Sequence, residues 1–275
     1  MKIIFLNRFF HPDHSATSQI LSGLVFYLAQ HKHNVHVISS RLLYDNTTSV
    51  LTAKDLIQGV AVYRTWSSGL GRDNLVWRLL DYISFILTCA WQLFLICEVG
   101  DIVITKTDPP MLSAVTGIIV KIRRGTHINW LQDLFPEVAI ELGLPGFRGI
   151  LGRLLLRIRN LSLSGAAVNV VVGEYMRDRL CRENIPASRI SIIHNWAIDD
   201  CITPVPRQDN PLVQEWDLQD KFIVAYSGNL GRGHEFKTVL DAIGRLKDYT
   251  DIVFLFIGGG PGLEMVRQEI GRAHV

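Results

Sequence analysis

Short apolar runs alternate with longer helical patterns along most of the chain. Seven runs have the length and alternation typical of strands: 3–7, 35–40, 60–66, 101–106, 127–133, 168–173 and 190–196. The segments between them repeat apolar residues every three or four positions, which is typical of amphipathic helices. This alternation predicts an α/β fold with a parallel sheet covered on both faces, and with the 60–66 strand at an edge. Because such sheets bind ligands beyond the carboxyl ends of their strands, the loops that follow strands are the candidate sites.

The most apolar segment is 82–97, which contains no charged residue. It is shorter than the roughly 20 residues that a membrane-spanning helix needs. Polar residues recur at three or four positions and so share one helical face: Asp81, Ser84, Thr88 and Gln92. We predict a heavily buried amphipathic helix around 75–98. Contact with a membrane surface stays open as an alternative, and crossing of a membrane is not expected.

The pattern changes at about Ala197, where a stretch rich in charges and prolines begins. The strand and helix rhythm returns with strands at 222–228 and 252–258 and a helix at 235–249 between them. We therefore predict a Rossmann-like N-terminal domain at 1–200, a linker at 201–221 and part of a second Rossmann-like domain at 222–275. Two strands and one complete helix do not enclose a core, so the second domain is expected to be truncated.

The last residues follow the glycine loop Gly258-Gly259-Gly260 with the beginning of another helix. Gly271 enters this helix, and no apolar periodicity follows it. We expect that the natural chain continues and that 270–275 are wholly or partly non-native.

Composition places the chain among globular proteins, with 48% hydrophobic and 20% charged residues, and excludes a disordered chain. The net charge of +2 hides a basic excess at 121–190, where 11 Lys and Arg face 6 Asp and Glu. Such an excess is typical of a surface for anionic lipid or nucleic acid, and equally of a merely solvated face. The four cysteines lack the spacing of a metal or redox motif, so we expect buried free thiols: Cys89, Cys97, Cys181 and Cys201.

Three loops after N-terminal strands carry candidate chemistry. The first contains small residues that let an anion approach a helix start: His14, Ser15, Ala16 and Thr17. His11 and Asp13 stand near His14, but no further ligand has helpful spacing, and no metal site is predicted. The second loop is "TDPPML", in which capping of a helix by Asp108 is the default interpretation.

The third loop is "LQDLFPE", where Asp133 and Glu137 lie just beyond a strand end. Carboxylates at such a place bind a hydroxyl-rich acceptor or act as a base, while capping of the next helix is an equally good explanation. The second domain offers "YSGNLGRGHEF", a strand, a glycine-rich turn and a helix. In this turn, cationic side chains and flexible backbone suit an anion beside a helix start: Gly228, Asn229, Gly231, Arg232 and His234.

Six motifs together resemble the retaining nucleotide-sugar glycosyltransferases of family 4, in the branch of bacterial capsule, O-antigen or colanic acid synthesis. They are "FHPDHSATSQ" at 10–19, "TDPPMLS" at 107–113, "LQDLFPEVAIELG" at 131–143, "IIHNWA" at 192–197, "YSGNLGRGHEFKTVLDA" at 226–242 and "FIGGGPG" at 256–262. The resemblance implies the GT-B fold of two Rossmann-like domains. It also implies transfer of a sugar from a nucleoside diphosphate sugar to a glycan or polyprenyl-linked acceptor, with retention of the anomeric configuration.

The resemblance further implies roles for individual residues. Arg232 matches the family's diphosphate-binding arginine, and His234 stands where many members have lysine. Asp133 and Glu137 match the "D-L-W-P-E" signature and would bind the acceptor or shape the active site. The later Glu-x7-Glu motif of the family does not occur in the sequence, so the 275-residue chain is expected to be inactive alone.

By the same resemblance the protein would need no cofactor or metal, since the nucleotide sugar is a co-substrate. It would bind no nucleic acid and would work in the cytoplasm, in peripheral contact with the anionic inner membrane. Two alternatives stay open: a nucleotide-sugar epimerase of the same architecture, and a non-catalytic nucleotide-sugar-binding fragment.

Overall fold

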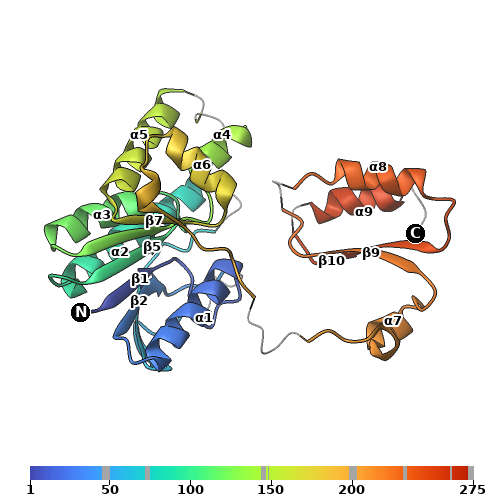
Figure 1. Ribbon diagram of the computed structural model, residues 1–275, viewed down its shortest axis with the longest axis horizontal. Helices are drawn as coiled ribbons and strands as arrows, with labels where there is room; N and C mark the ends of the chain where they lie inside the picture. Colours follow the sequence, from blue (N-terminus) through green and yellow to red (C-terminus); the bar gives the residue numbers. More distant parts are fainter. Residues whose placement is uncertain are drawn as a thin grey trace. The chain divides into compact units, whose positions relative to one another are not determined.

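The computed structural model describes residues 1–44, 50–71, 75–143, 147, 149–197, 203–231, 234–260 and 262–271. The chain divides into two compact units, Met1–Ile198 (unit 1) and Asp199–Val275 (unit 2). Figure 1 shows unit 1 in blue to yellow and unit 2 in orange and red. Each unit combines a sheet with helices.

Within the described residues, unit 1 forms an eight-stranded sheet of order β3-β4-β2-β1-β5-β6-β7-β8. The strands are Ile3–Leu6 (β1), Val35–Ser40 (β2), Lys54–Ile57 (β3), Val60–Thr65 (β4), Ile102–Lys106 (β5), Thr126–Trp130 (β6), Val168–Val171 (β7) and Ile190–Ile192 (β8). Neighbouring strands are parallel, except that β3 is antiparallel to β4. The predicted parallel α/β sheet is confirmed.

One detail of the sheet was predicted wrongly. The 60–66 run is not an edge strand, because β3 pairs with β4 and forms the edge itself. Lys54, Asp55 and Leu56 of β3 are all exposed, so this strand lacks the apolar run by which the others are recognised.

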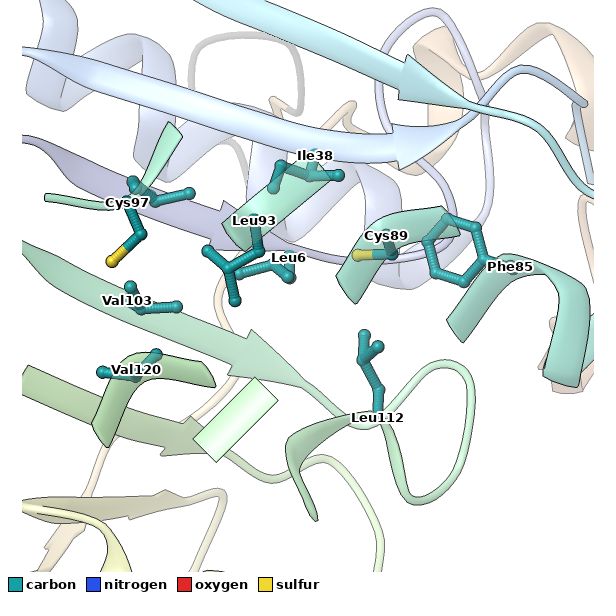
Figure 2. Packing of buried hydrophobic residues seen from close by; sticks show 10 residues of the cluster. Leu6, Ile38, Phe85, Cys89, Leu93, Cys97, Val103, Leu112 and Val120 are labelled. Atoms are coloured by element: carbon teal, nitrogen blue, oxygen red, sulfur yellow. The ribbon is translucent and has the colours of Figure 1, made fainter. Parts of the chain in front are cut away.

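Helices cover both faces of this sheet (Figure 1). They are Ala16–Gln30 (α1), Leu75–Ile96 (α2), Leu112–Ile122 (α3), Glu137–Glu141 (α4), Ile150–Gly165 (α5) and Glu174–Arg182 (α6). Successive strand residues point to opposite faces. Leu6 of β1 therefore packs with Phe85 and Leu93 of α2, as Figure 2 shows, while Phe5 packs in a separate cluster with Leu21 of α1.

The helix after β5 begins later than the motif "TDPP" suggests. Met111, with φ of 67°, stands at the N-cap position of α3, and its side chain makes no capping hydrogen bond. Asp108 lies three residues before this position, and its capping of the helix stays a prediction. The residues of the motif form the turn that leads from β5 into α3.

The α2 helix is much less buried than predicted. It is long and apolar enough to cross a membrane, yet only 28% of its most apolar 18-residue window is buried. The predicted polar face exists, but Asp81 of this face is buried and Ser84 is half-buried against the loop at 66–71. Large apolar side chains are exposed instead, among them Leu87 and Trp91.

Two cysteines are buried as expected, Cys89 and Cys97. Cys181 is exposed, contrary to the expectation of four buried thiols, because it lies on the outer side of the short helix α6. Cys201 lies outside the described residues.

Unit 2 contains the parallel strands Phe222–Ser227 (β9) and Ile252–Ile257 (β10). Its helices are Pro211–Glu215 (α7), Lys237–Arg245 (α8) and Leu263–Gly271 (α9), with a 3-10 turn at Arg207–Asp209 (η3). Leu230, Phe236 and Val266 form its small buried core. The segment predicted as a linker, 201–221, thus contains η3 and α7, and Val213 of α7 is buried.

Candidate functional site

The loops after β1, β5 and β6 meet at the carboxyl edge of the unit 1 sheet. The Arg8 backbone N–H donates to the Asp108 carbonyl oxygen at 2.9 Å, which joins the first loop to the second. The Gln132 backbone N–H lies 3.4 Å from the Thr107 hydroxyl, which joins the second loop to the third. This edge is where a sheet of parallel strands is expected to bind a ligand.

The first loop leaves the start of α1 open. Asp13 is buried and orders the loop by accepting hydrogen bonds from the Ser15 and Tyr44 backbone N–H groups. Ser15 is the N-cap residue, but its hydroxyl makes no hydrogen bond in the described part of the chain. His14 and Ala16 are exposed, and Thr17 is half-buried. The small residues predicted to receive an anion therefore surround a helix start whose N-cap side chain makes no capping hydrogen bond.

A pocket lies between the loops after β5 and β6. Its walls include Lys106 and Thr107 from one side, Asp133 and Phe135 from the other, and Arg159 of α5. It contains about 410 Å³ of space, part of which is open to solvent. One of the two predicted carboxylates thus borders a concave surface.

Asp133 lies exposed in the wall of this pocket. Reduced solvation raises the pKa of its carboxyl group, and a hydrogen bond from the Thr107 side chain opposes this rise. Because the side chain still reaches solvent, we expect the net rise to be small. A carboxylate at this place, just beyond a strand end, is suited to bind a sugar hydroxyl or to take its proton.

Glu137 has a different environment. It is the first residue of α4 and forms an ion pair with Arg159, with 2.5 Å between Oε1 and Nη2. Arg179 approaches the same oxygen to 3.8 Å. Glu137 is thus held in ion pairs with two arginines. The direct effect of Glu137 is to fix Arg159 in the pocket wall. Its predicted catalytic role stays a prediction.

Lys106 is a residue of this edge that the sequence pattern did not reveal. Its side chain is buried, and the ammonium has no hydrogen-bond partner among the described residues. It lies 3.9 Å from the ring centroid of Trp130, its register partner on β6. Burial lowers the pKa of Lys106 to about 8, while the charge of Asp108 acts in the opposite direction.

Trp130 is in turn covered by Trp196, which follows β8. The two indole rings stack with centroids 5.8 Å apart and an interplanar angle of 16°. Three segments far apart in the sequence therefore form one column of Lys106, Trp130 and Trp196. The only hint in the sequence was a lysine at the end of the otherwise apolar strand "DIVITK".

In unit 2, the candidate residues lie in two loops whose backbones touch. The Leu230 backbone N–H donates to the Gly259 carbonyl oxygen at 2.7 Å. A Cβ atom at Gly258, where φ is 141°, would lie 2.0 Å from the Gly228 carbonyl oxygen. A Cβ atom at Gly260 would lie 2.3 Å from the side-chain oxygen of Asn229. Both positions therefore need glycine, because a side chain would separate the loops.

The loop after β9 presents polar groups beside these glycines. His234 is exposed, and its Nδ1 lies 2.9 Å from the Tyr226 hydroxyl, which also donates to the Asn229 carbonyl oxygen. Gly231 completes the described part of the loop. Arg232, the predicted diphosphate-binding residue, lies outside the described residues. The structure thus brings together Gly228, Asn229, His234 and the glycine loop at the carboxyl edge of β9 and β10.

Neither edge shows a metal-binding arrangement in the part of the chain that the structure describes. No group of three or more His, Cys, Asp or Glu side chains is placed there to hold an ion. The groups available for chemistry are a carboxylate in a pocket of unit 1, and backbone N–H groups with an imidazole in unit 2.

Two curated proteins are similar in sequence. Probable glycosyltransferase WbjE of Pseudomonas aeruginosa is 30% identical over 173 residues, which cover 62% of this chain and 42% of WbjE. The putative colanic acid biosynthesis glycosyl transferase WcaI of Escherichia coli K12 is 23% identical over 284 residues, which cover 98% of this chain and 70% of WcaI. The chain thus spans less than half of WbjE. A comparison with models of protein families gives no match.

Solved structures support the fold. HepE of Anabaena, in complex with UDP, covers 99% of this chain with a TM-score of 0.65 and 14% identity, and the match spans 66% of HepE. A UDP-N-acetylglucosamine 2-epimerase from Rickettsia bellii covers 96% of the chain with a TM-score of 0.50 and 13% identity, and the match spans 63% of that enzyme. The predicted GT-B type of α/β fold is confirmed.

Proposed function

We propose that the protein is a glycosyltransferase that moves a sugar from a nucleoside diphosphate sugar to a glycan acceptor. The observation that carries this proposal is the similarity to WcaI, which extends over 98% of the chain. The UDP-glucose complex of the structural neighbour HepE supports a nucleotide sugar as the donor. In the reaction the bond between the anomeric carbon and the diphosphate oxygen breaks. A bond to the acceptor oxygen forms, and the products are the glycosylated acceptor, the nucleoside diphosphate and the proton of the acceptor hydroxyl.

The finer proposal is a retaining enzyme of family 4 that builds a cell-surface polysaccharide such as capsule, O-antigen or colanic acid. Its support is the order of the six motifs and the names of WbjE and WcaI. The acceptor would be polyprenyl-linked. The enzyme would therefore work in the cytoplasm, at the inner face of the membrane.

We assign the donor to the loops of unit 2. The leaving nucleoside diphosphate gains negative charge as the bond breaks, so it needs N–H groups and cations. Gly228, Asn229 and Gly231 would supply backbone N–H groups, and Arg232 would supply a cation. His234 stabilises the leaving group most effectively when it is protonated. The glycine loop at Gly258, Gly259 and Gly260 would hold the first loop in place.

We assign the acceptor to the pocket of unit 1. Asp133 would bind a hydroxyl group of the acceptor, and Glu137 would act through Arg159. The start of α1, at Ser15, Ala16 and Thr17, would receive a phosphate group.

A nucleotide-sugar epimerase is the second candidate, because the fold resembles the Rickettsia epimerase. The two functions differ in their need for an acceptor. The test uses the protein encoded by the complete reading frame and a panel of radiolabelled UDP- and GDP-sugars, with and without a polyprenyl diphosphate-linked sugar. Label that enters the lipid fraction only when acceptor is present supports the transferase. Interconversion of the nucleotide sugar without acceptor supports the epimerase, and no conversion of any donor contradicts both.

A further inference from the structure

The α2 helix turns several polar side chains toward the protein and exposes many of its large apolar ones, although others such as Phe85 and Leu93 are buried. The Asp81 carboxylate accepts hydrogen bonds from the Ser68 hydroxyl and from the Leu70 and Gly71 backbone N–H groups. It also lies 3.6 Å from the buried Arg8 guanidinium. Asp81 therefore orients the helix by fixing its polar face to the protein.

The rest of this polar face is also turned toward the protein. The Thr88 hydroxyl donates to the Trp66 carbonyl oxygen at 2.6 Å, and the Ser68 backbone N–H donates to the Ser84 hydroxyl at 3.0 Å. Together with Asp81, these bonds bind three successive turns of α2 to the loop at 66–71. The exposed apolar surface, which lies opposite the buried Phe85 and Leu93, cannot turn inward without breaking these bonds.

An apolar stripe runs along the outer surface of α2, with members three or four residues apart. They are Val76, Leu80, Ile83, Leu87, Trp91 and Phe94. Trp91 is 63% exposed and Leu87 is 62% exposed. At 1.5 Å per residue the stripe is roughly 27 Å long. This is unusual, because soluble monomers rarely expose so much contiguous apolar surface.

The neighbouring helix α3 widens this surface. Ile118 and Ile122 of α3 are each 63% exposed, and the α2 and α3 helices pack against each other. Arg123, just after α3, joins the two helices: its Nε donates to the Cys97 carbonyl oxygen at 2.7 Å, and its guanidinium lies 5.2 Å from the Phe94 ring centroid. The exposed apolar surface therefore extends over both α2 and α3.

Basic residues outnumber acidic ones around this surface, and the exposed Glu98 just after α2 is paired with Lys2. Residues 75–96 and 112–124 contain four basic residues, Arg78, Lys121, Arg123 and Arg124. Their only acidic residue is Asp81, which is buried on the inner face of α2. An apolar surface with basic residues beside it complements a bilayer with anionic headgroups, where tryptophan also prefers to lie.

We propose that α2 lies in the plane of a membrane interface, with the stripe from Val76 to Phe94 inserted among anionic lipids and Lys121 and Arg124 beside their headgroups. This deepens the membrane contact of the proposed function and rests on that function only for its biological purpose. A helix fixed through Asp81 and Thr88 cannot cross the bilayer without leaving its hydrogen bonds. The length and hydropathy of α2 therefore suit binding along the membrane surface and not crossing of the membrane.

The test measures binding of the purified full-length protein to two kinds of vesicle, phosphatidylcholine alone and phosphatidylcholine with phosphatidylglycerol. We expect Leu87→Glu to weaken binding to the anionic vesicles by at least about tenfold, because it places a charge in the inserted stripe. Tyr27→Glu is the matched control, since Tyr27 is 58% exposed on α1, on the opposite face of the sheet. Both variants must keep the circular dichroism and the cooperative unfolding of the parent.

Two further measurements make this test more specific. Lys121→Gln with Arg124→Gln should weaken binding to anionic vesicles and leave binding to neutral ones unchanged. Trp91 should shift its fluorescence to shorter wavelength on binding, and Trp91→Phe should remove part of this shift. Equal binding of the Leu87→Glu and Tyr27→Glu variants would overturn the proposal. So would a parent that binds no vesicles but forms a dimer that Leu87→Glu dissociates, because the stripe would then be an interface between two copies. These outcomes do not depend on whether the protein transfers sugar.

Discussion

Each unit has a candidate ligand-binding edge at the carboxyl ends of its parallel strands, but the two edges consist of different groups. Unit 1 uses ionisable side chains at its edge, such as the buried Lys106 ammonium and the Asp133 carboxylate. Unit 2 uses backbone packed against backbone, with glycine at 258 and 260 where a side chain would collide. The first edge should therefore respond to pH, and the second to any added side-chain volume.

The largest effect is expected in unit 2, from Gly258→Ala. The new Cβ atom would meet the Gly228 carbonyl oxygen, and the positive φ would strain the backbone as well. We expect unit 2 to lose about 4 kcal/mol of stability, near the upper end for single substitutions. Urea unfolding followed by hydrogen exchange at Leu230 measures this loss.

Gly259→Ala is the control for this experiment, because a Cβ atom there would meet no atom within 4 Å. If both variants lost the same stability, close packing of the loops would not explain the glycines.

In unit 1, Lys106→Met should stabilise the protein by about 3 kcal/mol at pH 7, because a pKa near 8 instead of 10.5 means that charging the buried lysine is costly. Between pH 8 and 10.5 the unfolded chain binds more protons than the folded one, so the stability of the parent rises with pH. The variant should lack this rise. Parallel slopes of unfolding free energy against pH for parent and variant would contradict the assignment.

Unit 1 should also respond to acid pH, through His127 near the start of β6. It is buried, its Nε2 lies 3.2 Å from the Thr105 hydroxyl, and burial lowers its pKa to about 4. As pH falls from 6.5 to 4, His127 binds a proton in the unfolded chain but not in the folded protein. The parent should lose about 3 kcal/mol over this range. Urea titrations at several pH values should show that His127→Gln reduces this loss, and an unchanged loss would refute the explanation.

The smallest effect is expected for Trp196→Ala. The indole is partly exposed and covers Trp130 by stacking, so its removal should cost about 1 kcal/mol. Because Trp196 belongs to unit 1, hydrogen exchange at Leu230 in unit 2 should not change. A loss of protection there would show that the two edges do not behave independently.

Most of the sheet was predictable because seven of its strands carry apolar runs. The edge strand β3 was missed because exposed edge positions tolerate Lys54 and Asp55. Periodicity showed correctly that Asp81 and Thr88 share a face of α2. It did not show which face is buried, since that depends on the N–H and hydroxyl groups that the 66–71 loop offers to Asp81.

The candidate sites, like the sheet, could be predicted only in part. The position of Asp133 in the pocket wall could be predicted because it lies just beyond a strand end, where parallel sheets bind ligands, while its role stays a prediction. Lys106 was missed because Trp130, whose ring its ammonium approaches, comes from another segment. Only the register of β5 and β6 brings Lys106 beside Trp130.

The central claim is that unit 1 binds the acceptor and unit 2 binds the donor of a glycosyl transfer. Steady-state kinetics of the full reading-frame product test it through Asp133→Asn and His234→Ala, with each substrate varied in turn. We predict that Asp133→Asn raises KM for the acceptor and changes KM for the donor by less than about twofold, and that His234→Ala does the reverse. The claim is contradicted if no acceptor-dependent transfer occurs with any nucleotide sugar, or if the two variants exchange these effects.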